Sequence, residues 1–182
     1  MIIGITGSFG AGKGTLVELL VTEKSFHHFS ASGFITEEIV RRNLEVNRDS
    51  MAVVANDLRA HFGPSYIIDS LYARANEHPG DVIIESLRAV AEVKRIKELG
   101  GYVIGIDALP ATRYERILQR NSNKDHVSYE KWLEQEQTES NQEDEHKQNI
   151  FGALALSDIV IKNDGTIAEL DTAVDVWLAS LT

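Results

Sequence analysis

The sequence has 182 residues and a mass of 20.2 kDa, a length that fits one domain with a sizeable buried core. It contains no cysteine, which excludes disulfides and thiolate metal sites and is compatible with a reducing compartment. The net charge of −10 argues against a broad nucleic-acid surface, because such a surface needs clustered Lys and Arg. No apolar stretch approaches the ~20 residues of a membrane span, and no charged leader precedes the first strand. We therefore expect a cytoplasmic protein, monomer or homodimer, without nucleic-acid or membrane partners.

A glycine-rich loop follows the first predicted strand. The apolar run at residues 2–6 predicts that strand, and residues 7–15 then read Gly-Ser-Phe-Gly-Ala-Gly-Lys-Gly-Thr before a helix predicted at 14–24. Glycines let backbone N–H groups turn inward around an anion, and the lysine and the helix N-terminus both place positive charge beside it. The loop predicts a site for nucleotide phosphates, formed by Gly10, Ala11, Gly12, Lys13, Gly14 and Thr15.

The residue after the lysine is Gly14, where the common form of this loop has Ser or Thr, and Thr15 follows one step later. This Gly-Lys-Gly-Thr ending resembles the P-loop of the nucleoside monophosphate kinases, adenylate kinase in particular. The resemblance implies ATP as the phosphoryl donor and Mg²⁺ as a cofactor, with Lys13 catalytic and Thr15 acting on the metal through water.

A weaker strand is predicted at 26–30, and an insertion with two or three helices at 33–80, broken at Gly63-Pro64 and Pro79-Gly80. In a monophosphate kinase an insertion at this place binds the acceptor. The resemblance therefore implies an acceptor clamp with hinges at these breaks, which closes over the substrate.

The stretch Ser30-Ala-Ser-Gly33 resembles the Ser-Thr-Gly that opens the acceptor site of adenylate kinases, which implies substrate contacts from Ser32 and Gly33. The Asp-x-x-Arg that usually follows is absent, so another arginine must bind the acceptor phosphate. Guanidinium forks suit phosphate better than lysine does. We prefer Arg59 and also select Arg41, from the candidates Arg41, Arg42, Arg48 and Arg59.

Residues 81–85 predict a strand that is buried on both faces, with a helix at 88–99. The run Ile-Glu-Ser-Leu-Arg at 84–88 stands where monophosphate kinases carry Asp-Gly-x-Pro-Arg. The resemblance implies that Glu85 orients Mg²⁺-bound water and that Arg88 binds the acceptor phosphate, both as catalytic residues; a strand-end carboxylate can also cap the next helix. Adenylate kinases have a base-reading Gln four residues after the arginine, and Glu92 here either reads a base or lies on a solvated helix face.

The next strand is predicted at 101–107 and the next helix at 110–120. Arg113, Arg116 and Arg120 lie three and four residues apart, so they can share one helix face. Such donors stack on the donor base or neutralise charge on the transferred phosphoryl group. Arg116 is therefore a candidate for donor-nucleotide binding and Arg120 the main catalytic candidate of this helix.

Residues 121–156 stand in the place of the lid of these kinases. Lys124 is a second, weaker catalytic candidate there. The lids of adenylate kinases are rich in arginine, whereas residues 134–145 are strongly acidic. This run indicates a solvated helix face and not a metal site.

The last strand is predicted at 158–162 and the last helix at 167–181, joined by Asn163-Asp-Gly-Thr166. In related kinases this loop lies against the donor adenine, which implies that Asn163 and Gly165 contact the donor. Turn chemistry alone also favours these residues.

Alternating strands and helices predict an α/β P-loop NTPase fold with a five-stranded parallel sheet and helices on both faces. Most of the chain also resembles a group of small P-loop kinases related to dephospho-CoA and cytidylate kinases. The shared segments are residues 86–93, Arg113 to Arg116 with Arg120, and Ala155 to Asp158 leading to the 163–166 loop.

These resemblances imply an ATP- and Mg²⁺-dependent phosphotransferase whose acceptor is a nucleoside or deoxynucleoside monophosphate. One alternative is a hydroxyl acceptor such as dephospho-CoA or a sugar, for which Glu85 or Asp57 would serve as base. Another is a nucleotide-binding regulatory protein with weak hydrolysis, in which the acidic lid segment binds a partner.

Overall fold

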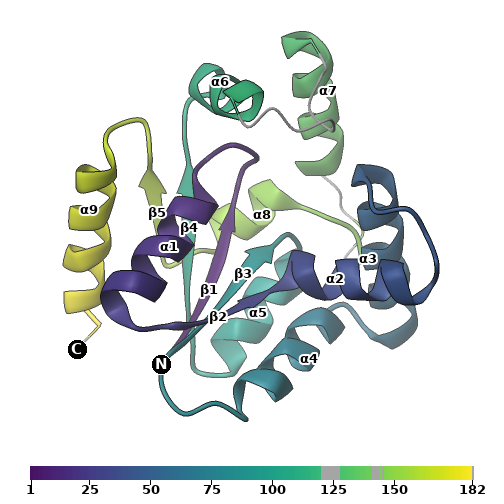
Figure 1. The fold of residues 1–182 in the computed structure, drawn as a ribbon, viewed down its shortest axis with the longest axis horizontal. Helices are drawn as coiled ribbons and strands as arrows, with labels where there is room; N and C mark the ends of the chain where they lie inside the picture. The colour runs from purple at the N-terminus through teal and green to yellow at the C-terminus, as the bar shows by residue number, and fades with distance from the viewer. Residues whose placement is uncertain (120–127, 141–143, 145, 182) are drawn as a thin grey trace.

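A computed structural model describes residues 1–119, 128–140, 144 and 146–181, and it shows a parallel β-sheet with helices on both faces (Figure 1). The sheet order is β2-β3-β1-β4-β5, and every pairing is parallel. The strands are β1 (Ile2–Gly7), β2 (His27–Ser30), β3 (Val82–Leu87), β4 (Tyr102–Asp107) and β5 (Ile159–Lys162). The predicted fold class is confirmed, and each strand lies within two residues of its predicted range.

The helices follow the predicted alternation with the strands. The first insertion contains three helices, the first of which begins directly after β2, and the second insertion contains α7 and α8. The bounds are α1 (Lys13–Lys24), α2 (Ala31–Arg41), α3 (Arg48–Phe62), α4 (Tyr66–Ala75), α5 (Val90–Glu98), α6 (Pro110–Gln119), α7 (Tyr129–Ser140), α8 (Ile150–Ala155) and α9 (Ile167–Ala179). Within the described residues, none of these helices is long and apolar enough to cross a membrane.

One face of the sheet is covered by α1 and α9 (Figure 1). Leu16 and Leu20 of α1 and Val174 of α9 pack on sheet residues such as Ile5 and Ile104, all fully buried. Trp177 of α9 lies edge-on to Tyr102 with ring centroids 6.3 Å apart. This apolar layer holds β1 at the centre of the sheet and α1 beneath the glycine-rich loop.

The other apolar core joins the first insertion to the rest of the molecule. Ile39 of α2, Val54 of α3 and Ile67 of α4 belong to the same buried cluster as Ile84 of β3 and Val93 of α5. Helix α3 begins with a capping box in which the Asn47 side chain accepts from the Ser50 N–H and the Ser50 hydroxyl accepts from the Asn47 N–H. Residues 33–80 are therefore packed into the body of the domain.

Candidate functional site

The loop between β1 and α1 is built around glycines that have no room for a side chain. Gly10 and Gly12 have φ of 77° and 102°, a region that favours glycine. A Cβ on Gly10 would lie 2.4 Å from the Arg113 carbonyl oxygen, and one on Gly12 would lie 2.3 Å from Asn163 Nδ2. The Asn163 side chain also donates to the Ala11 carbonyl at 2.8 Å. The loop is thus clamped on its outer side by α6 and by the loop after β5.

Free space lies beside Gly14, the second residue of α1. A Cβ on Gly14 would meet no atom within 4 Å. Lys13 begins α1, and its Nζ donates to the carbonyls of Gly7 and Ser8 at 2.8 and 2.9 Å. The lysine charge and the helix N-terminus therefore lie together at the loop, an arrangement that suits the phosphates of a nucleotide.

Cationic side chains from three parts of the chain gather on Phe9, in the middle of this loop. The Arg88 and Arg48 Cζ atoms lie 4.2 and 4.5 Å from the Phe9 ring centroid, and Lys13 Nζ lies 5.9 Å from it. Cations are attracted to the face of an aromatic ring at such distances. The fold thus brings Arg48, the first residue of α3, and Arg88, which follows β3, to the phosphate loop.

Glu85, near the end of β3, accepts hydrogen bonds from the hydroxyls of Ser30 and Ser86, and His28 Nε2 lies 3.7 Å from its Oε1. Burial raises the pKa of this carboxyl, but the nearby His28 imidazole and the hydrogen bonds from Ser30 and Ser86 outweigh burial and hold the pKa at about 2. Glu85 is therefore a carboxylate at neutral pH. The Ser30 hydroxyl also caps α2 by accepting from the Gly33 N–H at 3.0 Å and lies 3.0 Å from the Ser32 hydroxyl, so Ser32 and Gly33 lie beside Glu85.

Ser86 is the bulged residue of β3. Ile5 pairs with Glu85 and Thr6 with Leu87, so Ser86 is passed over, and it has a φ of 69°. This is a left-handed backbone, which glycine adopts at the least cost and serine only rarely. The bulge redirects the chain so that Arg88 turns toward the loop after β1.

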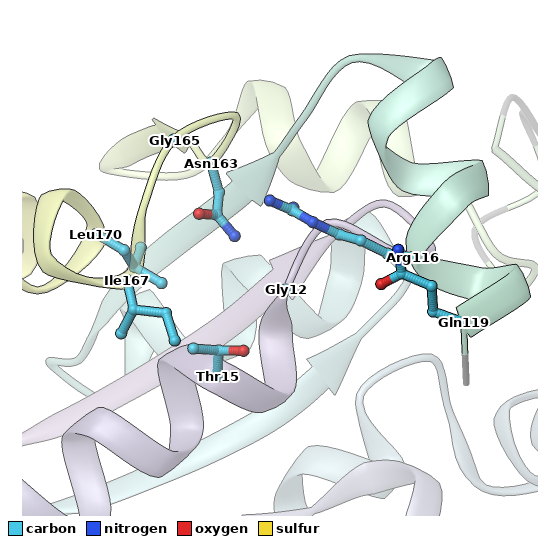
Figure 2. A pocket seen from close by; sticks show the side chains of 8 residues that line it. All are labelled: Gly12, Thr15, Arg116, Gln119, Asn163, Gly165, Ile167 and Leu170. Carbon is cyan, nitrogen blue, oxygen red and sulfur yellow. The ribbon is translucent and has the colours of Figure 1, made fainter.

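A pocket of about 370 Å³ opens on the other side of the loop, between α1, α6 and the start of α9 (Figure 2). Figure 2 shows the Arg116 side chain reaching across Gly12 toward Asn163. Arg116 Nη1 is buried and has no hydrogen-bond acceptor among the residues that the structure describes. The pocket is lined by Gly12, Thr15, Arg116, Gln119, Asn163, Gly165, Ile167 and Leu170. Four residues expected at the donor nucleotide, Thr15, Arg116, Asn163 and Gly165, are thus brought together with Gly12.

Arg113 of α6 is buried, although the sequence predicts that it shares a ligand-facing side of this helix with Arg116 and Arg120. It is 5% exposed, and its guanidinium forms a two-pronged ion pair with Glu136 of α7. It also donates to the carbonyls of Ala108 and Phe9, at 2.9 and 3.3 Å. Glu136 is 4% exposed, so the expectation that the acidic run is wholly a solvated face is wrong at this residue.

The ends of β4 and β5 add a carboxylate that the sequence analysis did not single out. Lys162 Nζ donates to Asp107 Oδ2 at 2.8 Å, and Arg113 Nε lies 3.7 Å from Oδ1. Burial raises the pKa of Asp107, but the hydrogen bond from Lys162 and the charges of Lys162 and Arg113 outweigh burial and lower the pKa. Asp107 therefore joins the end of β4 to the end of β5 and to α6.

Arg59 and Glu92 have a different place from the one expected. They are 1% and 0% exposed, and they pair with each other: Arg59 Nε and Nη2 donate to Glu92 Oε1 at 3.0 and 2.8 Å. We therefore correct both assignments, because these side chains present no surface to an acceptor.

No described contact links the remaining expected residues to the phosphate loop. The Arg41 side chain is 75% exposed and pairs with Glu38, so its role at the substrate stays a prediction. Arg42 joins Glu38 to Asp57. Arg120 and Lys124 lie outside the described residues.

Comparison with known proteins agrees with this geometry. The family model described as "AAA domain" matches residues 3–148. The chain is similar to a UPF0200 protein of Thermococcus gammatolerans, with 26% identity over 181 residues that cover 96% of this chain and 92% of the relative.

Solved structures share the fold along the full chain. TT1252 from Thermus thermophilus has a TM-score of 0.65 at 20% identity and covers 100% of this chain and 98% of its own. Shikimate kinase from Bacteroides thetaiotaomicron has a TM-score of 0.63 at 13% identity and covers 98% of both chains. The chain belongs to the AAA domain family, and its parallel sheet with a glycine-rich loop after β1 is the fold that these solved structures share.

Proposed function

We propose that this protein transfers the γ-phosphoryl group of ATP to an acceptor that itself carries a phosphate, most simply a nucleoside or deoxynucleoside monophosphate. The observation that carries the proposal is the cation cluster on Phe9, in which Arg48 and Arg88 lie within 4.5 Å of the ring centroid and Lys13 within 5.9 Å. In a chain with a net charge of −10, three cations gathered at one end of the P-loop favour an anionic ligand.

The two carboxylates named as possible bases, Glu85 and Asp57, favour a phosphate acceptor over a hydroxyl acceptor. A hydroxyl acceptor is helped by a general base whose pKa lies near the working pH. The pKa of Glu85 is about 2, and the hydrogen bond from Arg42 lowers the pKa of Asp57. Both groups are weak bases, whereas a phosphate acceptor is already an anion and needs positioning more than deprotonation.

The donor would occupy the opposite side of the loop. The open face at Gly14 and the N–H groups of residues 10–15 suit the phosphates, and the pocket beside Arg116 suits the base. Glu85 is the residue that would hold Mg²⁺ through water, and the metal would supply charge neutralisation between the phosphates. Thr15, the other residue expected at the metal, lines the donor pocket instead. Lys13 would leave the carbonyls of Gly7 and Ser8 to meet the transferred phosphoryl group.

A coupled assay that screens nucleoside and deoxynucleoside monophosphates against hydroxyl acceptors tests the proposal. Turnover with at least one monophosphate, and not with the hydroxyl compounds, is the expected result. Arg88→Lys keeps the charge but loses the two-pronged geometry, so the acceptor KM should rise about tenfold and kcat should fall while ATP binding changes little. Equal losses of ATP and acceptor affinity would remove Arg88 from the acceptor side.

The regulatory alternative predicts a different result from the same screen. ATP would bind and hydrolyse slowly, and no small acceptor would accelerate its turnover. That outcome across the common nucleosides would contradict the kinase assignment and direct attention to a partner for the α7 segment.

A further inference from the structure

The buried carboxylate of Glu92 joins the first insertion to the turn that carries Arg88. Its Oε1 accepts from both Nε and Nη2 of Arg59, on α3. Its Oε2 accepts from the backbone N–H groups of Arg88 and Ala89, at 2.7 and 3.1 Å. Four donors thus satisfy the carboxylate, which is what a buried charge requires.

The turn at Arg88 is held on its other side as well. The Arg88 carbonyl accepts from the Asn149 N–H at 2.7 Å, and the Leu87 carbonyl accepts from the Thr6 hydroxyl at 2.8 Å. Both polar backbone atoms of Arg88 therefore have partners on other segments. Its backbone position depends on α3 through Glu92, on the start of α8 and on β1.

Helix α3 carries two arginines that serve this region in different ways. Arg48 begins the helix and lies over Phe9, whereas Arg59, three turns later, is buried against Glu92. An α-helix is rigid over this length. The Arg59–Glu92 pair therefore holds Arg48 and Arg88, the two arginines on Phe9, at a set spacing.

We propose that Arg59 and Glu92 are positioning residues that keep the acceptor-phosphate site formed before any ligand arrives. This inference rests on the proposed function for the identity of the ligand. It differs from the hinged clamp that the breaks in residues 33–80 predict, because the shared apolar core and the buried pair hold the insertion on the body of the domain. Arg59 acts through Arg48 and Arg88 and does not itself touch the substrate.

The test compares the double variant Arg59→Met/Glu92→Gln with Arg95→Met in the full chain. The double variant removes both charges, so neither is left buried alone, and it keeps an amide oxygen for the N–H groups of Arg88 and Ala89. Arg95 of α5 pairs with Asp69 of α4 at 2.6 Å on the surface. It is a matched control because it also joins the first insertion to α5, away from the phosphate loop.

Two measurements are made on each variant. Calorimetry gives the affinity for ATP, as a non-hydrolysable analogue, and for a bisubstrate probe that joins two adenosines through five phosphates. In the double variant the affinity for the probe should fall at least about tenfold while the ATP affinity stays within about twofold. Hydrogen exchange of residues 48–52 and 86–92 should be about tenfold faster than in wild type. Arg95→Met should change neither quantity more than about twofold.

The outcomes separate this proposal from the proposed function. Unchanged probe affinity in a folded double variant would overturn the positioning role, and so would equal losses for the probe and ATP. If the probe binds wild type no better than ATP does, adenosine monophosphate is not the acceptor, and exchange alone then decides the positioning role. Exchange that is faster at both segments in the double variant but not in Arg95→Met supports it, and exchange that does not differ between the two overturns it.

Discussion

Each insertion is fastened to the domain by a buried Arg–Glu pair, yet the two attachments differ in what surrounds them. Arg59–Glu92 joins α3 to α5 within an apolar core that includes residues of α2, α4, β3 and β4. Arg113–Glu136 joins α6 to α7 beside the rings of Tyr114, Tyr129 and Trp132. The ring centroid of Trp132 lies 5.0 Å from Arg113 Cζ.

The difference indicates which part can move. Opening the first insertion would expose a large apolar surface together with an ion pair, whereas releasing α7 would expose a small aromatic cluster together with one. Arg113 also donates to the Phe9 carbonyl. The same side chain that holds Glu136 of α7 therefore contacts the phosphate loop. We therefore expect the acceptor side to be fixed and the α7 side to open and close.

The largest effect is expected from comparing Arg59→Met with Arg113→Met. Removing Arg59 leaves the Glu92 charge buried, which should lower the free energy of unfolding by about 3–5 kcal/mol. Removing Arg113 should cost less, because α7 can detach and return Glu136 to water. Urea titration measures the first effect. Hydrogen exchange should show faster exchange in Arg113→Met mainly over residues 129–140, and equal global losses would contradict the distinction between the two insertions.

Lys13→Ala should strongly reduce turnover, because the lysine would contact the phosphoryl group that passes from donor to acceptor. The lysine contacts the loop carbonyls and not the apolar core, so turnover should fall about a hundred- to a thousandfold while the melting temperature changes little. Lys24→Ala is the control, because Lys24 pairs with Asp175 at the far end of α1. Unchanged turnover in purified Lys13→Ala would remove the loop from the mechanism.

The stability of Glu85→Gln as a function of pH tests whether Glu85 is a carboxylate held by its hydrogen bonds. The folded-state pKa of Glu85 is about 2, against 4.5 for the free group, so the carboxylate stabilises the fold above pH 4.5. Wild type should exceed the variant by about 3 kcal/mol at pH 7. The advantage should shrink as the pH falls from about 4.5 to about 2, as followed by urea titration of both proteins. A difference that does not depend on pH would mean that Glu85 acts by packing and not by charge.

Arg116→Ala is expected to have the smallest effect, and one confined to the donor. Its side chain lines the pocket beside Gly12, so the ATP KM should rise about tenfold with the acceptor KM unchanged. Initial rates with each substrate varied in turn give both constants. A rise in the acceptor KM alone would mean that Arg116 binds the acceptor and not the donor.

The fold was predictable because its signals are local. Apolar runs such as 82–84 and 103–104 are dense in Val and Ile, as strands covered on both faces are, and the glycines of the loop identify the end of β1. The loop after β5 was placed near the donor by resemblance and Arg116 by its helical spacing, and the structure brings them to one pocket.

The side-chain pairings were not predictable because they join distant residues. Arg59 and Glu92 are 33 positions apart, and each lies on a helix whose sequence is equally compatible with an exposed charge. Glu136 stands among other acidic residues, and no local pattern marks it as the buried one. Lys13, Arg48 and Arg88 were candidates for phosphate binding from the sequence, but no local pattern shows that they meet on Phe9. Such contacts depend on tertiary packing, which short-range periodicity does not contain.

The empty space beside Gly14 has a consequence for how this loop can be redesigned. A side chain there would meet no atom within 4 Å, and serine is well tolerated in the first turn of a helix. The fold therefore does not impose glycine at this position, and a single change to serine would produce the commoner Gly-Lys-Ser form of the loop. Exchanging the two forms of the loop in this chain therefore needs no compensating change among the atoms around residue 14.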